Sequence, residues 1–422
     1  MHDFHYKNNR LYCEKVDVSE LAARFGTPLY VYSHHTIMDH YLKLKKAFSV
    51  LKPLICFSVK SNSNLTILKS LVDQGAGLDI VSGGELYRAR KIGTPPERIV
   101  YASVGKTENE IEEAMRAGIF AFNVESLNEL GLISEVAARL KKDARACLRL
   151  NPNVDPHTHR YITTGTIENK FGIDFEMARI IFLNRSHFKR VKLVGLHVHL
   201  GSQITQAQPF LAALKKVCVF LDMLKKMGIA LECLNIGGGL GIIYKDESPQ
   251  TAEMFAKQVI PILKKTGLKI VLEPGRFIVG NAGILVAKVI YLKETKTKRF
   301  VIVDTGMNDL MRPSLYEAYH EVVPVVNLEN QKSGAETLKK SDVVGPICES
   351  SDFLAKNRDL PIFEPGDFLA VLGAGAYGFS MSSNYNSRCR AAEVMVKGDR
   401  YFLIRARETL ADLTRLEKVL SL

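Results

Sequence analysis

Lys60 follows directly on the apolar run Leu54–Val59, a position where an inward-pointing amine is unusual. If burial desolvates this amine, the low dielectric penalises the ammonium form, and the neutral amine can form an imine with an aldehyde. A lysine that snorkels to water at the end of a strand is the ordinary alternative for a single residue of this kind. The other motifs of the chain must therefore decide between the two interpretations.

Further chemistry-bearing residues also stand at the ends of apolar runs. Asp79 lies in the run Gly77–Val81, and Glu273 follows another such run. An unpaired carboxylate at a strand end is costly, so we expect Glu273 to meet a cationic partner. His197 and His199 are spaced to share one face of a strand, which suits a metal pair or packing against an aromatic ring. No third ligand converges on them in the sequence to favour zinc.

Two glycine clusters could approach a ligand closely. Gly237–Gly239 can let backbone N–H groups approach a phosphate, although an ordinary tight turn explains this cluster equally well. Gly373–Gly378 matches G-x-G-x-x-G, but the residues that follow have no helical period. The dinucleotide fingerprint therefore lacks its required helix, and we reject a Rossmann interpretation.

Cysteine usage indicates a reducing compartment. The chain has seven cysteines, an odd number with no C-x-x-C pair, which argues against a disulfide framework or a zinc ribbon. Cys348 lies in a turn-rich stretch beside carboxylates. An exposed cysteine there is more often incidental, yet a thiol can also act as a proton donor.

The elements that must position these residues alternate short apolar runs with helix-like segments, the pattern of βα units around a parallel sheet. Each run is nearly continuous in apolar residues, as a strand covered on both faces should be. Eight parallel strands predict a (β/α)8 TIM-type barrel, with its chemistry at the carboxyl ends of the strands. The runs are Leu54–Val59, Gly77–Val81, Arg98–Ala102, Ile119–Val124, Ala146–Leu150, Leu193–Leu200, Leu231–Ile236 and Leu268–Leu272. The helix-like segments include Glu108–Ala117, Ser126–Leu140, Gln208–Met227 and Thr251–Lys265.

After Arg276 the pattern changes to strands separated by turns, with no long amphipathic helix before the C-terminus. These segments predict a mainly antiparallel β-domain, of sandwich or barrel type, with which the strand-like first 33 residues could pair through Leu29–Tyr32. We therefore expect a barrel domain at 35–285 and a β-domain formed by 1–34 and 286–422. The predicted strands are Ile284–Tyr291, Phe300–Val303, Glu321–Val326, Phe368–Leu372 and Glu393–Phe402.

Size and charge fit this plan. A chain of 422 residues with 46% apolar content can build two cores. The net charge of +12 comes from dispersed lysine pairs typical of solvated helix faces, and the dense cluster Lys293–Arg299 reads as a hairpin turn. We find no apolar run long enough to span a bilayer and no signal-peptide core, so we expect a cytoplasmic protein without a nucleic-acid or membrane partner.

The motifs, in this order, resemble those of the fold-type III pyridoxal-phosphate-dependent decarboxylases, and the resemblance covers essentially the whole chain. One motif could be chance, but nine in order are not. They are Phe57–Asn62, Asp79 with Ser82–Glu85, Asn169–Gly172, His199–Gln203, Gly237–Gly239, Glu273–Arg276, Met311–Tyr316, Cys348–Asp352 and Ala376–Gly378. The stretch Asn151–His159 departs slightly from the family pattern, and Ser351 stands where glycine is common.

The resemblance implies a role for each matching residue. Lys60 would be the Schiff-base lysine, His199 would lie against the ring of pyridoxal 5'-phosphate, and Glu273 would contact its pyridine nitrogen. Cys348 would be a second catalytic residue that reaches the site of the neighbouring subunit in a homodimer. The implied cofactor-binding residues are Lys60, Asp79, His199, Ser202, Gly238, Gly239, Glu273, Pro274, Gly275, Arg276 and Tyr377. The implied substrate-binding residues are Arg276, Arg312, Tyr316, Glu349 and Tyr377.

Glu273 also predicts the type of reaction. A carboxylate keeps the pyridinium protonated and makes the ring a strong electron sink, which favours decarboxylation over racemisation. The reaction that the resemblance implies converts meso-2,6-diaminopimelate to L-lysine and CO2, and Arg312 and Glu349 suit such a substrate because it has a second amino-acid head. A decarboxylase of the ornithine or arginine type is the alternative, and a non-catalytic cofactor-carrying homologue is a third possibility. Such a homologue would be expected to have lost Lys60 or Cys348, and this chain keeps both.

Overall fold

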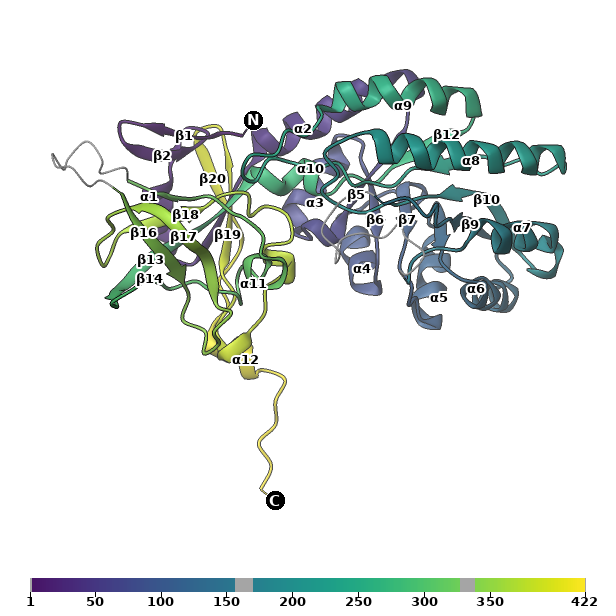
Figure 1. Cartoon of the computed structure of the whole chain (residues 1–422). Coiled ribbons are helices and arrows are strands. Elements are labelled where there is room, and N and C mark those ends of the chain that lie inside the picture. Colours follow the sequence, from purple (N-terminus) through teal and green to yellow (C-terminus); the bar gives the residue numbers. More distant parts are fainter. Residues whose placement is uncertain (1, 156–169, 327–337, 422) are drawn as a thin grey trace. The chain divides into compact units, whose positions relative to one another are not determined.

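The computed structural model describes residues 2–155, 170–326 and 338–421, and this part of the chain forms two compact units (Figure 1). The barrel unit comprises His40–Ile242 and Ser248–Phe277. The β unit comprises Met1–Asp39, Ile243–Glu247 and Ile278–Leu422. Asn169 and the 156–159 part of the Asn151–His159 stretch lie outside the described residues.

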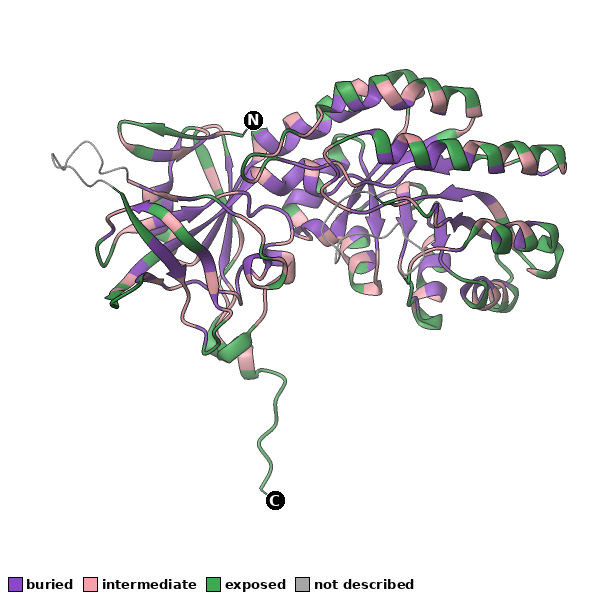
Figure 2. Ribbon diagram, in the orientation of Figure 1, coloured by how far each residue is buried: buried purple, intermediate pink, exposed green. Residues whose placement is uncertain are grey.

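Each of the eight predicted apolar runs forms a strand of the barrel unit. All neighbouring pairs are parallel, and β12 pairs back to β5, so the predicted closed barrel is confirmed. The strands are nearly all buried because helices cover the outside while side chains fill the inside (Figure 2). They are β5 (Leu54–Ser58), β6 (Gly77–Ile80), β7 (Ile99–Tyr101), β8 (Ala121–Val124), β9 (Ala144–Arg149), β10 (Val191–His197), β11 (Cys233–Asn235) and β12 (Lys269–Leu272).

The four helices expected in the barrel are present within a residue or two of their predicted ends. They are α5 (Glu108–Ala117), α6 (Leu127–Leu140), α8 (Gln208–Lys226) and α9 (Ala252–Thr266). Helix α5 begins at a capping box in which Thr107 and Glu110 satisfy each other's backbone N–H groups. The sequence had not indicated α2 (His34–Ala47), α3 (Leu65–Asp73), α4 (Gly83–Lys91) and α7 (Phe175–Leu183). Among the described residues, no helix is long and apolar enough to span a membrane.

The β unit contains a large sheet in the order β17-β16-β14-β13-β4-β19-β20. As predicted, the N-terminal strand β4 (Leu29–Ser33) joins this sheet, and a turn joins β13 (Gly283–Glu294) to β14 (Arg299–Val303). Strand β4 is central, antiparallel to β13 and parallel to β19 (Ala392–Lys397). The sheet is therefore mainly antiparallel, with a second parallel pair at β14 and β16 (Leu338–Val344).

Several expectations for the β unit need correction. The run Glu393–Phe402 is a hairpin of β19 and β20 (Arg400–Arg405), not one strand. Strands β16 and β17 (Phe353–Pro361) were not predicted, because their exposed positions carry charged side chains. Helix α10 (Arg276–Val279) follows the last barrel strand, and further elements of the β unit are β1 (Phe4–Lys7), β2 (Arg10–Cys13), β3 (Val16–Asp17), α1 (Val18–Phe25), α11 (Arg312–Tyr316), β15 (Val322–Pro324), β18 (Phe368–Val371) and α12 (Leu410–Thr414).

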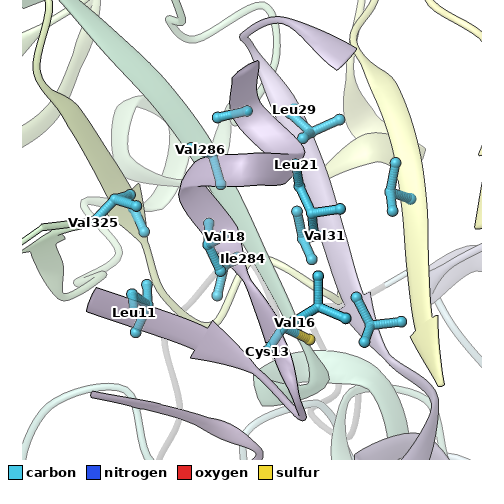
Figure 3. Close-up of a cluster of buried hydrophobic side chains, with 14 of the residues drawn as sticks. Leu11, Cys13, Val16, Val18, Leu21, Leu29, Val31, Ile284, Val286 and Val325 are labelled. Atoms are coloured by element: carbon cyan, nitrogen blue, oxygen red, sulfur yellow. The ribbon is translucent and has the colours of Figure 1, made fainter. Parts of the chain in front are cut away.

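A cluster of buried apolar side chains stabilises the β unit (Figure 3). Helix α1 falls inside the segment that the sequence had suggested to be strand-like. Its residues Val18 and Leu21 are fully buried against Val31 and Ile284 of the sheet. Burial of such side chains contributes about 1.5–3 kcal/mol each relative to exposure. The N-terminal segment is thus an integral part of this unit.

Candidate active site

Two layers of inward-facing side chains fill the barrel near its carboxyl end. Residues two apart on a strand face the same side, so the apolar or small residues Ala121, Cys147, Gly195, Cys233 and Val271 lie one layer below a polar set. Cysteines 147 and 233 approach each other to 3.5 Å between sulfur atoms, and Gly195 leaves room for them. The polar set, two residues further along each strand, is Asn123, Arg149, His197, Asn235 and Glu273.

Lys60 reaches into this end of the barrel from a 3-10 turn, η2 (Val59–Ser61), that follows β5. Its Nζ lies 2.9 Å from Oδ2 of Asp79 in β6, and 34% of the lysine side chain is exposed. The amine is therefore only partly desolvated, whereas the sequence had also allowed a fully buried amine. A buried carboxylate holds it in place instead.

Asp79 is completely buried and accepts a second hydrogen bond, 2.7 Å long, from the hydroxyl of Ser58. Burial, followed by the charge of Glu273, raises the pKa of Asp79, while Lys60 opposes this rise. Asp79 Oδ1 has no hydrogen-bond partner among the described residues. Asp79 Oδ2 is thus fixed by two hydrogen bonds, whereas Oδ1 receives none from the described residues.

Glu273, immediately after β12, is also buried and is held by three side chains. Its Oε1 accepts from the amides of Asn123 at 2.9 Å and Asn235 at 2.6 Å, and its Oε2 lies 3.2 Å from Nε2 of His197. Burial alone would raise the pKa of Glu273. His197, through its charge and hydrogen bond, and then the charge of Lys60, outweigh burial and lower it. Glu273 is therefore an ionised carboxylate, and the basic side chains that act on it are those of His197 and Lys60.

The two histidines have separate roles. His199 does not pair with His197 on a shared ligand; its Nδ1 accepts a hydrogen bond of 3.2 Å from the N–H of Gly238. Burial, followed by the positive charges of Arg149 and Lys60, lowers the pKa of His199 well below its ordinary value, so its ring is neutral near pH 7. Within the described ranges, no cluster of three His, Cys, Asp or Glu side chains could hold a metal ion.

The glycine turn after β11 leaves no space for side chains. A Cβ on Gly238 would lie 2.0 Å from the carbonyl oxygen of Glu273, and one on Gly239 would lie 2.6 Å from that of Gly201. Gly239 also has φ of +113°, which favours glycine. Beside this turn, Nε and Nη2 of Arg276 donate to the hydroxyl of Ser202 at 3.2 and 3.0 Å. A hydroxyl and a guanidinium thus lie side by side next to the glycine turn, and together they can bind an anion.

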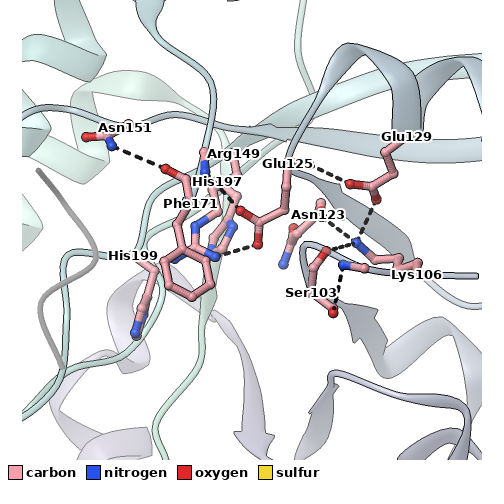
Figure 4. A network of polar contacts seen from close by, with 12 residues as sticks. Ser103, Lys106, Asn123, Glu125, Glu129, Arg149, Asn151, Phe171, His197 and His199 are labelled. Atoms are coloured by element: carbon pink, nitrogen blue, oxygen red, sulfur yellow. Dashed lines mark hydrogen bonds and ion pairs between the residues drawn. The ribbon is translucent and has the colours of Figure 1, made fainter. Parts of the chain in front are cut away.

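Two buried ion pairs support the polar layer, and sequence reasoning had not identified them (Figure 4). Lys106 Nζ lies 2.6 Å from Glu129 and donates to the carbonyl oxygen of Asn123 at 3.0 Å. Arg149 lies 2.5 Å from Glu125. Glu125 and Arg149 could have been found from the sequence, because each is a charged residue inside or next to an apolar run. Nothing in the spacing pointed to Lys106.

Pro274 and Gly275 directly follow Glu273 in the barrel unit, and the remaining predicted site residues belong to the β unit. Arg312 is buried at the start of α11, and Tyr316 ends that helix. Cys348 is exposed, and the neighbouring Glu349 accepts hydrogen bonds of 2.7 Å from Tyr385 and from a nearby serine hydroxyl. Tyr377 has φ of +56°, a left-handed conformation that is uncommon for a side chain of this size. The G-x-G-x-x-G segment that contains it is followed by a 3-10 turn, not by the α-helix of a dinucleotide fold.

Residues 34–280 match the family model described as the pyridoxal-binding domain of pyridoxal-dependent decarboxylases. The whole chain is 48% identical to diaminopimelate decarboxylase of Haemophilus influenzae, with all of both chains covered. It is 49% identical to the Aquifex aeolicus protein of that name, over 96% of this chain and 94% of the relative. The chain belongs to the diaminopimelate decarboxylase family. A crystal structure of a Helicobacter pylori member in complex with L-lysine has a TM-score of 0.90 and 42% identity, covering 95% of this chain and 99% of that one.

The cofactor of this family is pyridoxal phosphate, and the polar layer of the barrel fits it. The ionised, buried Glu273 suits the protonated nitrogen of the ring, and the glycine turn with Ser202 and Arg276 suits the phosphate. Lys60 Nζ, held by Asp79, supplies the amine that an aldehyde requires.

The glycine turn yields a direct test. In Gly238→Ala the new methyl group meets the backbone of Glu273, so we expect cofactor affinity to fall by roughly tenfold or more. Gly105→Ala is the matched control, because a Cβ there meets nothing within 4 Å. Titration of each apoprotein with pyridoxal phosphate, followed by absorbance, measures the effect. Equal affinities for the two variants would contradict the assignment of this turn to the phosphate.

Proposed function

We propose that this protein removes CO2 from meso-2,6-diaminopimelate to give L-lysine, the last step of lysine biosynthesis. The observation that carries the proposal is the buried, ionised carboxylate of Glu273 at the centre of the barrel. Bound pyridoxal phosphate supplies the electron-withdrawing ring that a decarboxylation requires. The names of the full-length relatives support diaminopimelate as the substrate.

The barrel residues hold the cofactor and control its charge. Lys60 would hold the cofactor through its amine, which can condense with an aldehyde with loss of water, and Asp79 holds that amine in position. Glu273 would keep a proton on the ring nitrogen, and the neutral imidazole of His199 would lie against the cofactor ring. Residues 35–285 form the cofactor-binding domain in this proposal. The other proposed cofactor-binding residues are Ser202, Gly238, Gly239, Pro274, Gly275, Arg276 and Tyr377.

The substrate has two amino-acid heads, of which one reacts and the other must be recognised. Arg312 suits the carboxylate of the distant head, because guanidinium and carboxylate form paired hydrogen bonds. Glu349 suits the ammonium group of the same head. These two residues favour diaminopimelate over ornithine or arginine, which have no carboxylate at that end. Arg276, Tyr316 and Tyr377 complete the proposed substrate-binding set.

Cys348 is proposed to return a proton to the substrate carbon that has lost CO2. Cys348 is exposed, and it lies far along the chain from the barrel motifs. Both facts support the idea that it acts in the site of a partner subunit. An isologous homodimer would contain two such shared sites. All seven cysteines are free thiols, which supports a reducing, cytoplasmic environment.

The proposed reaction is tested by mixing the purified protein with pyridoxal phosphate and measuring CO2 release. We expect release from meso-diaminopimelate and little from ornithine, arginine or lysine. Faster release from ornithine or arginine would assign the protein to the alternative substrate class, and no release from any of the four would contradict decarboxylation.

The role of Glu273 is tested by Glu273→Gln. A neutral amide cannot hold the proton on the ring nitrogen, so we expect kcat to fall by roughly 10²- to 10³-fold or more while the cofactor still binds. The control Glu294→Gln changes a largely exposed side chain, with 64% of its surface accessible, and should leave kcat unchanged. Unchanged turnover in Glu273→Gln would overturn the electron-sink argument.

The shared site is tested by mixing two inactive variants, Lys60→Ala and Cys348→Ala, under conditions that allow subunits to exchange. One site of each heterodimer would combine an intact Lys60 with an intact Cys348. Random mixing makes about half of the dimers heterodimers, so activity should recover to about a quarter of wild type. No recovery after demonstrated exchange would mean that one chain supplies both residues.

A further inference from the structure

The guanidinium of Arg312 is held by two other side chains of the β unit. Arg312 is only 6% exposed, and its Nη1 lies 2.8 Å from Nε2 of His320. Its Cζ lies 4.5 Å from the centre of the Tyr244 ring. The rings of His320 and Tyr244 contact each other edge to face, with centroids 5.3 Å apart. One hydrogen-bond donor and one face of the guanidinium are thereby fixed.

The contacts of His320 determine its protonation. Nδ1 lies 2.8 Å from the carbonyl oxygen of Leu372, which can only accept, so Nδ1 carries the hydrogen. Arginine can only donate, so Nε2 must be unprotonated. Both contacts form together only when the imidazole is neutral. A neutral imidazole orients Arg312 without cancelling its positive charge, whereas a carboxylate in the same place would cancel it.

Tyr244 is itself fixed from two sides. Glu247 accepts hydrogen bonds of 2.8 Å from the backbone N–H groups of Tyr244 and Lys245, which holds this short segment in a turn. The ring packs against Gly373, where a Cβ would lie 3.2 Å from two ring carbons. Gly373 has φ of +67°, so glycine suits both the backbone and the close approach. The ring is therefore a rigid support for a cation–π contact with Arg312.

We propose that His320 and Tyr244 are positioning residues that make the protein specific for a substrate carrying a carboxylate at the end distant from the reacting carbon. This inference rests on the proposed role of Arg312 in substrate binding. A bidentate pair with a carboxylate requires the guanidinium plane to be set in advance, because a freely rotating arginine loses more entropy on binding. His320 and Tyr244 set that plane.

The test compares two ligands that differ in this carboxylate. L-Lysine retains it, whereas cadaverine has an amine chain of the same length and no carboxylate. In His320→Asn the shorter amide can still donate to Leu372 but cannot reach Arg312. We expect inhibition by L-lysine to weaken by roughly ten- to a hundredfold and inhibition by cadaverine to be unchanged. The KM for meso-diaminopimelate should rise by more than kcat falls.

Matched variants separate orientation from general damage. In His320→Gln the amide oxygen can accept from Arg312, so this variant should recover most of the L-lysine affinity. Tyr244→Phe keeps the ring and should behave as wild type, whereas Tyr244→Leu should resemble His320→Asn. These tyrosine variants carry the test if His320→Asn does not fold, as judged by circular dichroism.

A double-mutant comparison completes the test. In an Arg312→Met background, His320→Asn should cause no further loss of L-lysine affinity, because the guanidinium that it orients is absent. Equal weakening of both ligands, or the same loss in that background, would overturn the inference and leave the proposed function intact. A wild-type protein that neither releases CO2 from meso-diaminopimelate nor binds L-lysine would instead overturn the proposed function.

Discussion

The barrel unit is organised around one buried negative charge, the carboxylate of Glu273. An uncompensated carboxylate in an interior costs several kcal/mol, so the fold must bring hydrogen-bond donors to it. Asn123, Asn235 and His197 come from three different strands and converge only because the sheet closes into a barrel in this register. Lys106 in turn fixes the backbone carbonyl of Asn123. The closed sheet is therefore also the electrostatic support of the site.

In the β unit, the positively charged Arg312 is held by neighbouring side chains in a similar way. Glu273 is held by two amides and an imidazole, and Arg312 is held by an imidazole and an aromatic face. In each case the groups described here hold the ion in a fixed orientation. Ion pairs such as Arg149 with Glu125, whose charges cancel, lie in the supporting layer.

The sequence predicted the barrel well because strands covered on both faces leave continuous apolar runs, and all eight were found. Lys60, Asp79, His199 and Glu273 could be singled out as candidate site residues, since a polar residue at the end of such a run is conspicuous. Strands β16 and β17 were missed because their charged, exposed positions hide the pattern. Partnerships were harder to predict: Tyr244 and Arg312 are far apart in the chain, and only the folded structure places one against the other.

The central position of β4 has a consequence for how the protein is made. All five residues of this strand are buried, and its two neighbours follow much later in the chain, with β13 beginning at Gly283 and β19 at Ala392. At typical rates of synthesis, an interval on the order of tens of seconds separates the emergence of β4 from that of β19. During translation the ribosome therefore carries an apolar segment with unpaired edges, while all eight barrel strands emerge before β13. A nascent-chain chaperone would therefore have reason to cover β4 during this interval.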